Sequence, residues 1–188
     1  AQVVKEANAL EDKATRELWL DALRTFAKGG EEGFKALKEA TTWRRKIVPI
    51  DEFIYGKAFL DLSKEEVFPA VFDACAALDS DQYYEAVLTG ALGIGKSTLA
   101  NIMLARSLYK LSCMRSPQAT MGLQRRTSIV FTIQSVRLNT AKKAIFEEFS
   151  RYIHHSPYFK KYYMYDKTVT STMIFREQNV SIMPVSSS

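Results

Sequence analysis

The spacing of apolar residues predicts that the chain begins with helices. Apolar positions that step by three and four predict a first helix ending at Gly29-Gly30. Its apolar face comprises Val4, Ala7, Leu10, Ala14, Leu18, Ala22 and Phe26. A second, shorter helix is predicted over Glu31 to Thr41, because the acids of its first turn suit the positive end of a helix dipole. Residues 1–42 are therefore expected to form an N-terminal helical arm.

Two segments follow, and each contains a proline that interrupts the helical pattern. Trp43 to Ile54 is interpreted as an ordered connection, in which Pro49 breaks any helix. Lys64 to Leu78 is predicted to be helical again, with Pro69 as an interruption. Residues 43–188 are assigned to a single α/β domain on the basis of the strand patterns that come next.

From Glu85 onward the pattern alternates between strands and helices. Glu85–Thr89 and Ser128–Ile133 are short apolar segments, and each precedes a helical pattern. Asn139 or Thr140 can cap the second of these helices, whose apolar face is Ala141, Ile145, Phe149 and Tyr152 or Ile153. Two consecutive strand–helix units predict a parallel sheet with right-handed crossovers. Near the end, Thr172–Arg176 and Asn179–Met183 are predicted to form an extended pair joined near Gln178.

A glycine-rich segment follows the first predicted strand and matches G-x-x-x-x-G-K-[ST]. This phosphate-binding motif requires a strand before it and a helix after it, and the surrounding pattern supplies both. Its glycines leave backbone N–H groups open to phosphate, and the following helix adds its positive end. We expect Lys96 to contact the β- and γ-phosphates, Ser97 to bind Mg²⁺ and Thr98 to donate to the α-phosphate. The predicted nucleotide-binding residues are Gly90, Ala91, Leu92, Gly93, Ile94, Gly95, Lys96, Ser97 and Thr98.

Hydrolysis also requires acidic residues, which usually end an apolar strand. Asp166 is the nearest match after the loop, but tyrosines rather than aliphatic residues precede it and Lys167 follows it. The strand around Val180–Met183 ends without an acid. We therefore expect the catalytic carboxylates to lie beyond Ser188, and Lys96 is the one catalytic residue predicted within the chain. The loop alone does not distinguish ATP from GTP.

Composition restricts the class of protein more than its function. The chain has 188 residues, enough for one good core, and carries a net charge of +5. The positive charge gathers between Arg106 and Arg151, whereas the first 85 residues are rich in acids. The sequence has neither a membrane-length apolar run nor a secretion signal, so an intracellular protein is expected. Cys75 and Cys113 have no metal-ligand spacing and are expected to be small buried hydrophobic residues.

Together these segments resemble the ATPase domain of large terminase subunits, the DNA-packaging motors of tailed bacteriophages. The resemblance covers most of the chain, and several segments beside the phosphate loop carry it. They are Val48–Ile54, Ala58–Leu60, Val67–Pro69, Tyr84–Ala100, Ile129–Phe131, Ala144–Phe149, Ser156–Phe159 and Val180–Pro184. One departure concerns the loop itself, where many terminases carry an arginine and this chain has Ala91, Leu92 and Ile94.

The resemblance implies an additional-strand P-loop ATPase that is followed in the family by a nuclease domain. It implies ATP and Mg²⁺ as cofactors, and double-stranded DNA, a portal protein and a small terminase subunit as partners. It also implies a homo-oligomeric ring, usually a pentamer, that works at the capsid portal in the host cell cytoplasm. The chain would then hydrolyse ATP to translocate DNA into the capsid. A small-molecule kinase or a nucleotide-dependent switch is the alternative, and an assembly module with negligible turnover is a third possibility.

Several other residues have both a functional and a structural interpretation. Gln82, Tyr83 and Tyr84 could contact a base or could form a polar turn with packing tyrosines. Arg125 and Arg126 could act as an arginine finger, contact DNA or lie in a solvated loop. The lysines and aromatic residues of Tyr158–Tyr165 fit a stacking surface for single strands or amphipathic packing. His154-His155 lacks a third metal ligand and is interpreted as the cationic end of a helix.

Overall fold

The computed structural model describes residues 13–80, 82–140, 145–166 and 171–186. The chain forms two compact units, Ala1–Ile47 with Lys110–Arg125, and Val48–Tyr109 with Arg126–Ser188. The phosphate loop and the sheet belong to the second unit. Among the described residues, the helices fall short of the length and apolar character that a membrane span requires.

The first unit is built on a helical hairpin. Helices α2 (Lys13–Ala27) and α3 (Glu31–Thr42) pack against each other, and its buried cluster consists of Trp19, Ala22 and Ala40. Gly29 and Gly30 reverse the chain between them with φ values of 78° and 90°. The short helix α7 (Pro117–Thr120) completes the unit. Both predicted helices are confirmed where the structure describes them, while Val4, Ala7 and Leu10 lie outside the described residues.

The second unit places helices on one side of a mixed sheet. Its strands are β1 (Ile129–Ser135), β2 (Met173–Phe175) and β3 (Val180–Ser186), in the order β1-β3-β2. β1 runs parallel to β3 with Ile129 opposite Val180, and β2 runs antiparallel to β3. A 3-10 turn, η2 (Arg176–Gln178), joins β2 to β3 and confirms the extended pair predicted there. Pro184 is tolerated in the central strand because it lies past the residues that pair with β2.

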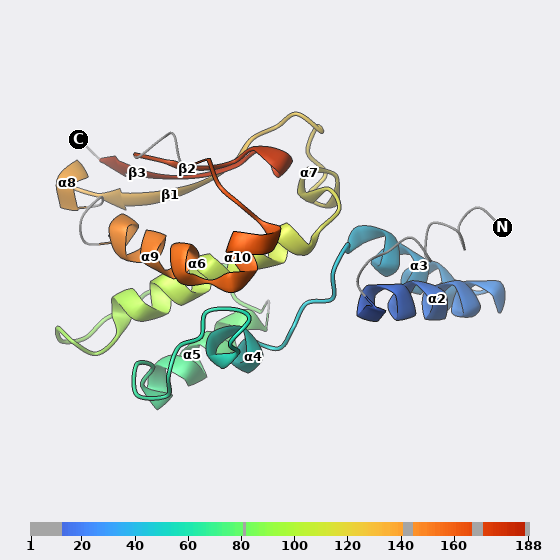
Figure 1. The fold of residues 1–188 in the computed structure, drawn as a ribbon, viewed down its shortest axis with the longest axis horizontal. Helices are drawn as coiled ribbons and strands as arrows, with labels where there is room; N and C mark the ends of the chain where they lie inside the picture. Colours follow the sequence, from blue (N-terminus) through green and yellow to red (C-terminus); the bar gives the residue numbers. More distant parts are fainter. Residues whose placement is uncertain (1–12, 81, 141–144, 167–170, 187–188) are drawn as a thin grey trace. The chain divides into compact units, whose positions relative to one another are not determined.

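Figure 1 shows α4, α5, α6, α9 and α10 below the sheet, with α4 and α5 farthest from it, and α8 at the end of β1 and β3. The helices are α4 (Ile50–Tyr55), α5 (Pro69–Asp79), α6 (Lys96–Cys113), α8 (Leu138–Thr140), α9 (Glu147–His155) and α10 (Pro157–Tyr162). The last four residues of α6 belong to the first unit. α9 buries Phe149 and Ile153, as its predicted apolar face requires. Tyr163, which follows α10, stacks on Phe175 of β2 with ring centroids 4.6 Å apart.

The predicted strand before the phosphate loop is not part of the sheet. Glu85–Thr89 is irregular, and it pairs with no strand among the described residues. The expected parallel core sheet is therefore wrong in two respects, because the sheet is mixed and because it lacks this strand. The physical reason is that a strand depends on a neighbouring strand, and an apolar run specifies no neighbour.

Proline positions account for the errors in the helices. α4 begins directly after Pro49, so the prediction of a helix-free connection up to Ile54 is wrong. α5 begins at Pro69 rather than at Lys64, because proline is accepted at the first position of a helix and disfavours helical geometry in the residue before it. Asn139 and Thr140 lie within the single turn α8, and Ala141 lies outside the described residues.

Candidate phosphate-binding site

The phosphate loop, Gly90–Ser97, leads directly into helix α6. Gly90, Gly93 and Gly95 have φ values of 131°, 84° and 89°, a region that L-residues with a Cβ adopt only with strain. At two of these positions a Cβ would also meet a neighbour. On Gly90 it would clash with Cδ1 of Ile94, and on Gly95 it would lie 2.6 Å from Cγ2 of Val71 in α5. Gly95 is thus favoured by its packing against Val71 as well as by its backbone conformation, whereas Ile94 can move away from a side chain at Gly90.

Lys96 holds the loop together from inside. Its Nζ donates hydrogen bonds to the carbonyl oxygens of Gly90 at 2.8 Å and Ala91 at 2.6 Å. The ammonium group has three N–H donors, so the loop carbonyls use two of them. The side chain therefore lies across the loop, where a phosphate would meet its charge.

The first turn of α6 supplies further hydrogen-bond donors. The Gly95 carbonyl accepts from the Leu99 N–H at 2.9 Å, which closes the first turn of the helix. The N–H groups before Leu99 have no partner within the helix, as at every helix N-terminus. Ser97 is exposed and Thr98 is half-buried. These residues thus present backbone donors and an accessible hydroxyl beside the lysine, an arrangement suited to an anion and its metal counter-ion.

Residues 30–185 match a protein family described as uncharacterized protein MJ0330, N-terminal P-loop domain. The chain belongs to this P-loop family. Comparisons with curated proteins and with solved structures found no match. The family match agrees with the loop geometry, and it identifies the domain by its phosphate loop rather than by any partner.

Helix α5 of this P-loop domain supports the loop from one side. Val71 fills the space beside Gly95, and Cδ2 of Phe68 lies 3.7 Å from the position of a Gly95 Cβ. Phe68 precedes α5 and has its carbonyl bonded by the N–H groups of Val71 and Phe72 at 2.9 and 3.0 Å. The start of α5 is therefore fixed against the end of the phosphate loop.

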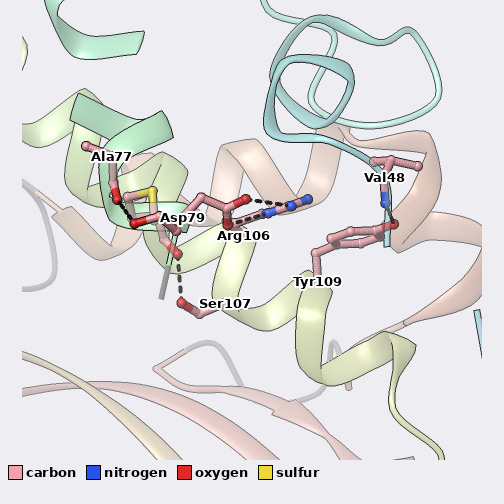
Figure 2. Close-up of polar contacts among 8 residues, drawn as sticks. Val48, Ala77, Asp79, Arg106, Ser107 and Tyr109 are labelled. Atoms are coloured by element: carbon pink, nitrogen blue, oxygen red, sulfur yellow. Dashed lines mark hydrogen bonds and ion pairs between the residues drawn. The ribbon is translucent and has the colours of Figure 1, made fainter. Parts of the chain in front are cut away.

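At its other end, α5 is joined to α6 by a buried ion pair. Arg106 Nε and Nη2 donate to the two carboxylate oxygens of Asp79 at 2.9 and 2.8 Å (Figure 2). Arg106 is 3% exposed, and its guanidinium lies 5.3 Å from the Phe53 ring centroid and 5.4 Å from that of Tyr109. Nearby, the Tyr109 hydroxyl accepts from the Val48 N–H at 3.1 Å (Figure 2).

Sequence reasoning missed the Asp79–Arg106 pair, although one signal was present. Arg106 interrupts the apolar spacing of Ile102, Ala105 and Tyr109 on α6. A charge on an otherwise apolar helix face indicates a buried partner, but the partner cannot be identified from local sequence.

The acidic candidate Asp166 lies far from the phosphate loop in sequence, and it forms hydrogen bonds with residues of β2 and of the turn after it. Its N–H donates to the Ile174 carbonyl at 2.8 Å, and Oδ2 accepts from Nε and Nη2 of Arg176 at 2.8 and 2.5 Å. The carboxylate is thus bound to an arginine at the end of the β2–β3 hairpin. This arrangement favours the structural interpretation of Asp166.

The remaining candidates divide between the core and the surface. Tyr158, Phe159 and Tyr163 are buried, which favours amphipathic packing over a stacking surface, while Lys160 and Lys161 are exposed. The other candidates on the described surface are Gln82, Tyr83, Tyr84, Arg125, Arg126, His154 and His155. Both histidines lie in the last turn of α9, and the described residues contain no cluster of three or more potential metal ligands.

Both cysteines are buried, as the sequence predicted, and form no disulfide with each other. Burial raises the pKa of the Cys75 thiol to about 11, and the negative charge of Asp79 adds to the shift. At this pKa the Cys75 thiol is protonated near neutral pH.

Proposed function

We propose that the chain binds the triphosphate of MgATP on the loop Gly90–Thr98. The hydrogen bonds of Lys96 across the loop are the observation that carries this proposal. They keep a cation at the glycine-rich loop that leads into the N-terminus of α6. In this proposal Lys96 contacts the β- and γ-phosphates, Ser97 binds Mg²⁺ and Thr98 donates to the α-phosphate.

We further propose that the bound nucleotide is hydrolysed, with Lys96 as a catalytic residue. Charge spreads over the γ-phosphate oxygens in the transition state of phosphoryl transfer, and a positioned ammonium stabilises that charge. Asp166 is not assigned to this step, since Arg176 binds its carboxylate.

The use of this reaction is proposed to be DNA translocation, as in the ATPase part of a phage large terminase. The support is the sequence resemblance together with the basic charge between Arg106 and Arg151. Exposed cations on α9 and α10, namely Arg151, Lys160 and Lys161, are available for contacts with phosphates of double-stranded DNA. A ring at a capsid portal, with portal and small-subunit partners in the host cytoplasm, belongs to the same proposal.

Two proposals are tested by one set of measurements: nucleotide hydrolysis and its use in DNA translocation. ATP binding and turnover by the protein are measured with and without double-stranded DNA. Replacing Lys96 by Ala should weaken MgATP binding roughly 10- to 150-fold, as expected for loss of a charged hydrogen bond, and should abolish turnover. Lys57→Ala is the matched control, because Lys57 is an exposed lysine of the same unit outside the loop.

DNA separates the candidate functions. A translocase should hydrolyse ATP faster with DNA and should lose that stimulation with Lys96→Ala. A small-molecule kinase should be indifferent to DNA, and an assembly module should bind nucleotide with negligible turnover under either condition. Equal MgATP affinity in wild type and Lys96→Ala would contradict the assignment of the loop itself.

A further inference from the structure

The aromatic residue nearest the end of the phosphate loop is exposed to solvent. Phe68 is 53% exposed, although its ring lies beside Gly95, with Cδ2 3.7 Å from the position of a Cβ there. Val71, three residues later, fills the remaining space against the same glycine and is buried. One aliphatic side chain thus closes the contact between α5 and the loop, while the neighbouring aromatic ring keeps much of its surface uncovered.

Hydrogen bonds at the start of α5 hold the backbone that carries this ring. Phe68 is extended, with φ −56° and ψ 143°, as the following Pro69 requires. Its carbonyl accepts two hydrogen bonds from the first turn of α5, from Val71 and Phe72. Little further backbone ordering is needed to present the ring, so a flat ligand group can bind it at a low entropic cost.

We propose that Phe68 is the platform on which the base of the bound nucleotide stacks. This inference rests on the proposed binding of a nucleoside triphosphate by the loop. Phosphates held at Gly90–Thr98 bring the covalently attached sugar and base to the edge of the loop, where the Phe68 ring offers an apolar face. Stacking buries that exposed face and adds favourable aromatic contact to the phosphate interactions.

This platform has a consequence for nucleotide specificity. A phenyl ring has no hydrogen-bonding group, so it recognises the face of a base and not the donors and acceptors on its edge. Phe68 therefore strengthens binding of ATP and GTP alike. The phosphate loop does not contact the base either. Phe68 and the loop together therefore produce a site that discriminates weakly between adenine and guanine.

Other exposed aromatic residues precede the loop and provide a rival platform. Tyr83 and Tyr84 are 57% and 103% exposed. They lie in an irregular segment, whereas Phe68 is anchored at the start of a helix. Tyr84→Ala is therefore the matched aromatic variant for the test.

The test measures binding of MgATP, MgGTP and inorganic tripolyphosphate with Mg²⁺ to the full chain by isothermal titration calorimetry. Phe68→Ala should weaken ATP and GTP binding roughly 5- to 150-fold, the range for loss of one base–aromatic stack, and should leave tripolyphosphate binding unchanged. Phe68→Trp should keep or improve nucleotide binding. Phe68→Leu should resemble Phe68→Ala in ligand preference while keeping apolar contact with the loop, so it covers the case in which the alanine variant folds poorly.

Tripolyphosphate distinguishes a stacking role from a structural one. If substitutions of Phe68 weaken tripolyphosphate as much as ATP, the ring supports the loop and the proposal is wrong. If Tyr84→Ala rather than Phe68→Ala separates ATP from tripolyphosphate, the base lies on the other platform and the proposal is also wrong. Failure of wild-type protein to bind any of the three ligands would instead reject the proposed nucleotide site.

Discussion

Removing the carboxylate of Asp79 should strongly destabilise the unit that contains the phosphate loop. Asp79→Ala takes both acceptors from a guanidinium that is 3% exposed. Loss of one partner from a buried ion pair typically costs about 3–5 kcal/mol, because the other charge remains buried without compensation. The Asp79 side chain is 14% exposed, so water can reach its position and the lower end, about 3 kcal/mol, is expected.

The aromatic contacts of Arg106 do not reduce the loss of stability expected for Asp79→Ala. The rings of Phe53 and Tyr109 lie against the guanidinium in the native protein, and we expect the same contacts in the variant. With a denaturant slope of about 2 kcal/mol per molar urea, a loss of about 3 kcal/mol lowers the unfolding midpoint by about 1.5 M. Urea unfolding followed by circular dichroism measures this shift.

Two further variants make the reasoning refutable. Asp79→Ala combined with Arg106→Met should be more stable than Asp79→Ala alone, since the double variant no longer buries a charge. Asp166→Ala is the exposed comparison, because its partner Arg176 is 73% exposed, and it should cost less than about 1 kcal/mol. If Asp79→Ala costs no more than Asp166→Ala, or if the double variant is the less stable, the buried pair does not hold α5 to α6 as inferred.

The loop and the buried thiol allow two smaller predictions. Gly95→Ala should weaken MgATP binding and stability more than Gly93→Ala, because both have positive φ but only the Gly95 Cβ meets Val71, at 2.6 Å; equal effects in calorimetry and urea unfolding would contradict this contact. Burial raises the Cys75 pKa from 9.0 to about 11, so its contribution to stability should be constant below pH 9 and should decline as the pH rises toward 11. Urea midpoints of wild type and Cys75→Ala across this range check the sign, and a wild-type midpoint that rose relative to the variant would contradict it.

Local sequence was sufficient to predict the helices and strands that pack against elements close to them in the chain. The α2–α3 hairpin and the β2–β3 hairpin each pair segments that are close in the chain. The sequence predicts all four of these elements. Glu85–Thr89 had the composition of a strand, but strand formation depends on a distant neighbour that the segment does not specify. The residues of the phosphate loop were predictable because a motif with fixed glycines states its backbone requirements directly.

The surroundings of the loop were less predictable for the same reason. Phe68 and Val71 precede Gly95 by more than twenty residues in the printed sequence, and no periodic pattern links them to it. Asp79 and Arg106 lie on different helices, so their pairing depends on how α5 and α6 pack. Local patterns therefore predicted the backbone conformation of the loop glycines better than the residues that surround the loop.

The hydrogen bonds from Lys96 to Gly90 and Ala91 change the meaning of a common experiment. The lysine acts as an internal brace that preorganises the loop, so part of the entropic cost of ordering the backbone is met during folding rather than during ligand capture. Lys96→Ala consequently removes the proposed phosphate contact and also makes the backbone of the phosphate loop less ordered. The affinity lost in that variant is the sum of two effects, and an ammonium supplied in solution could restore the charge but not the tethered brace.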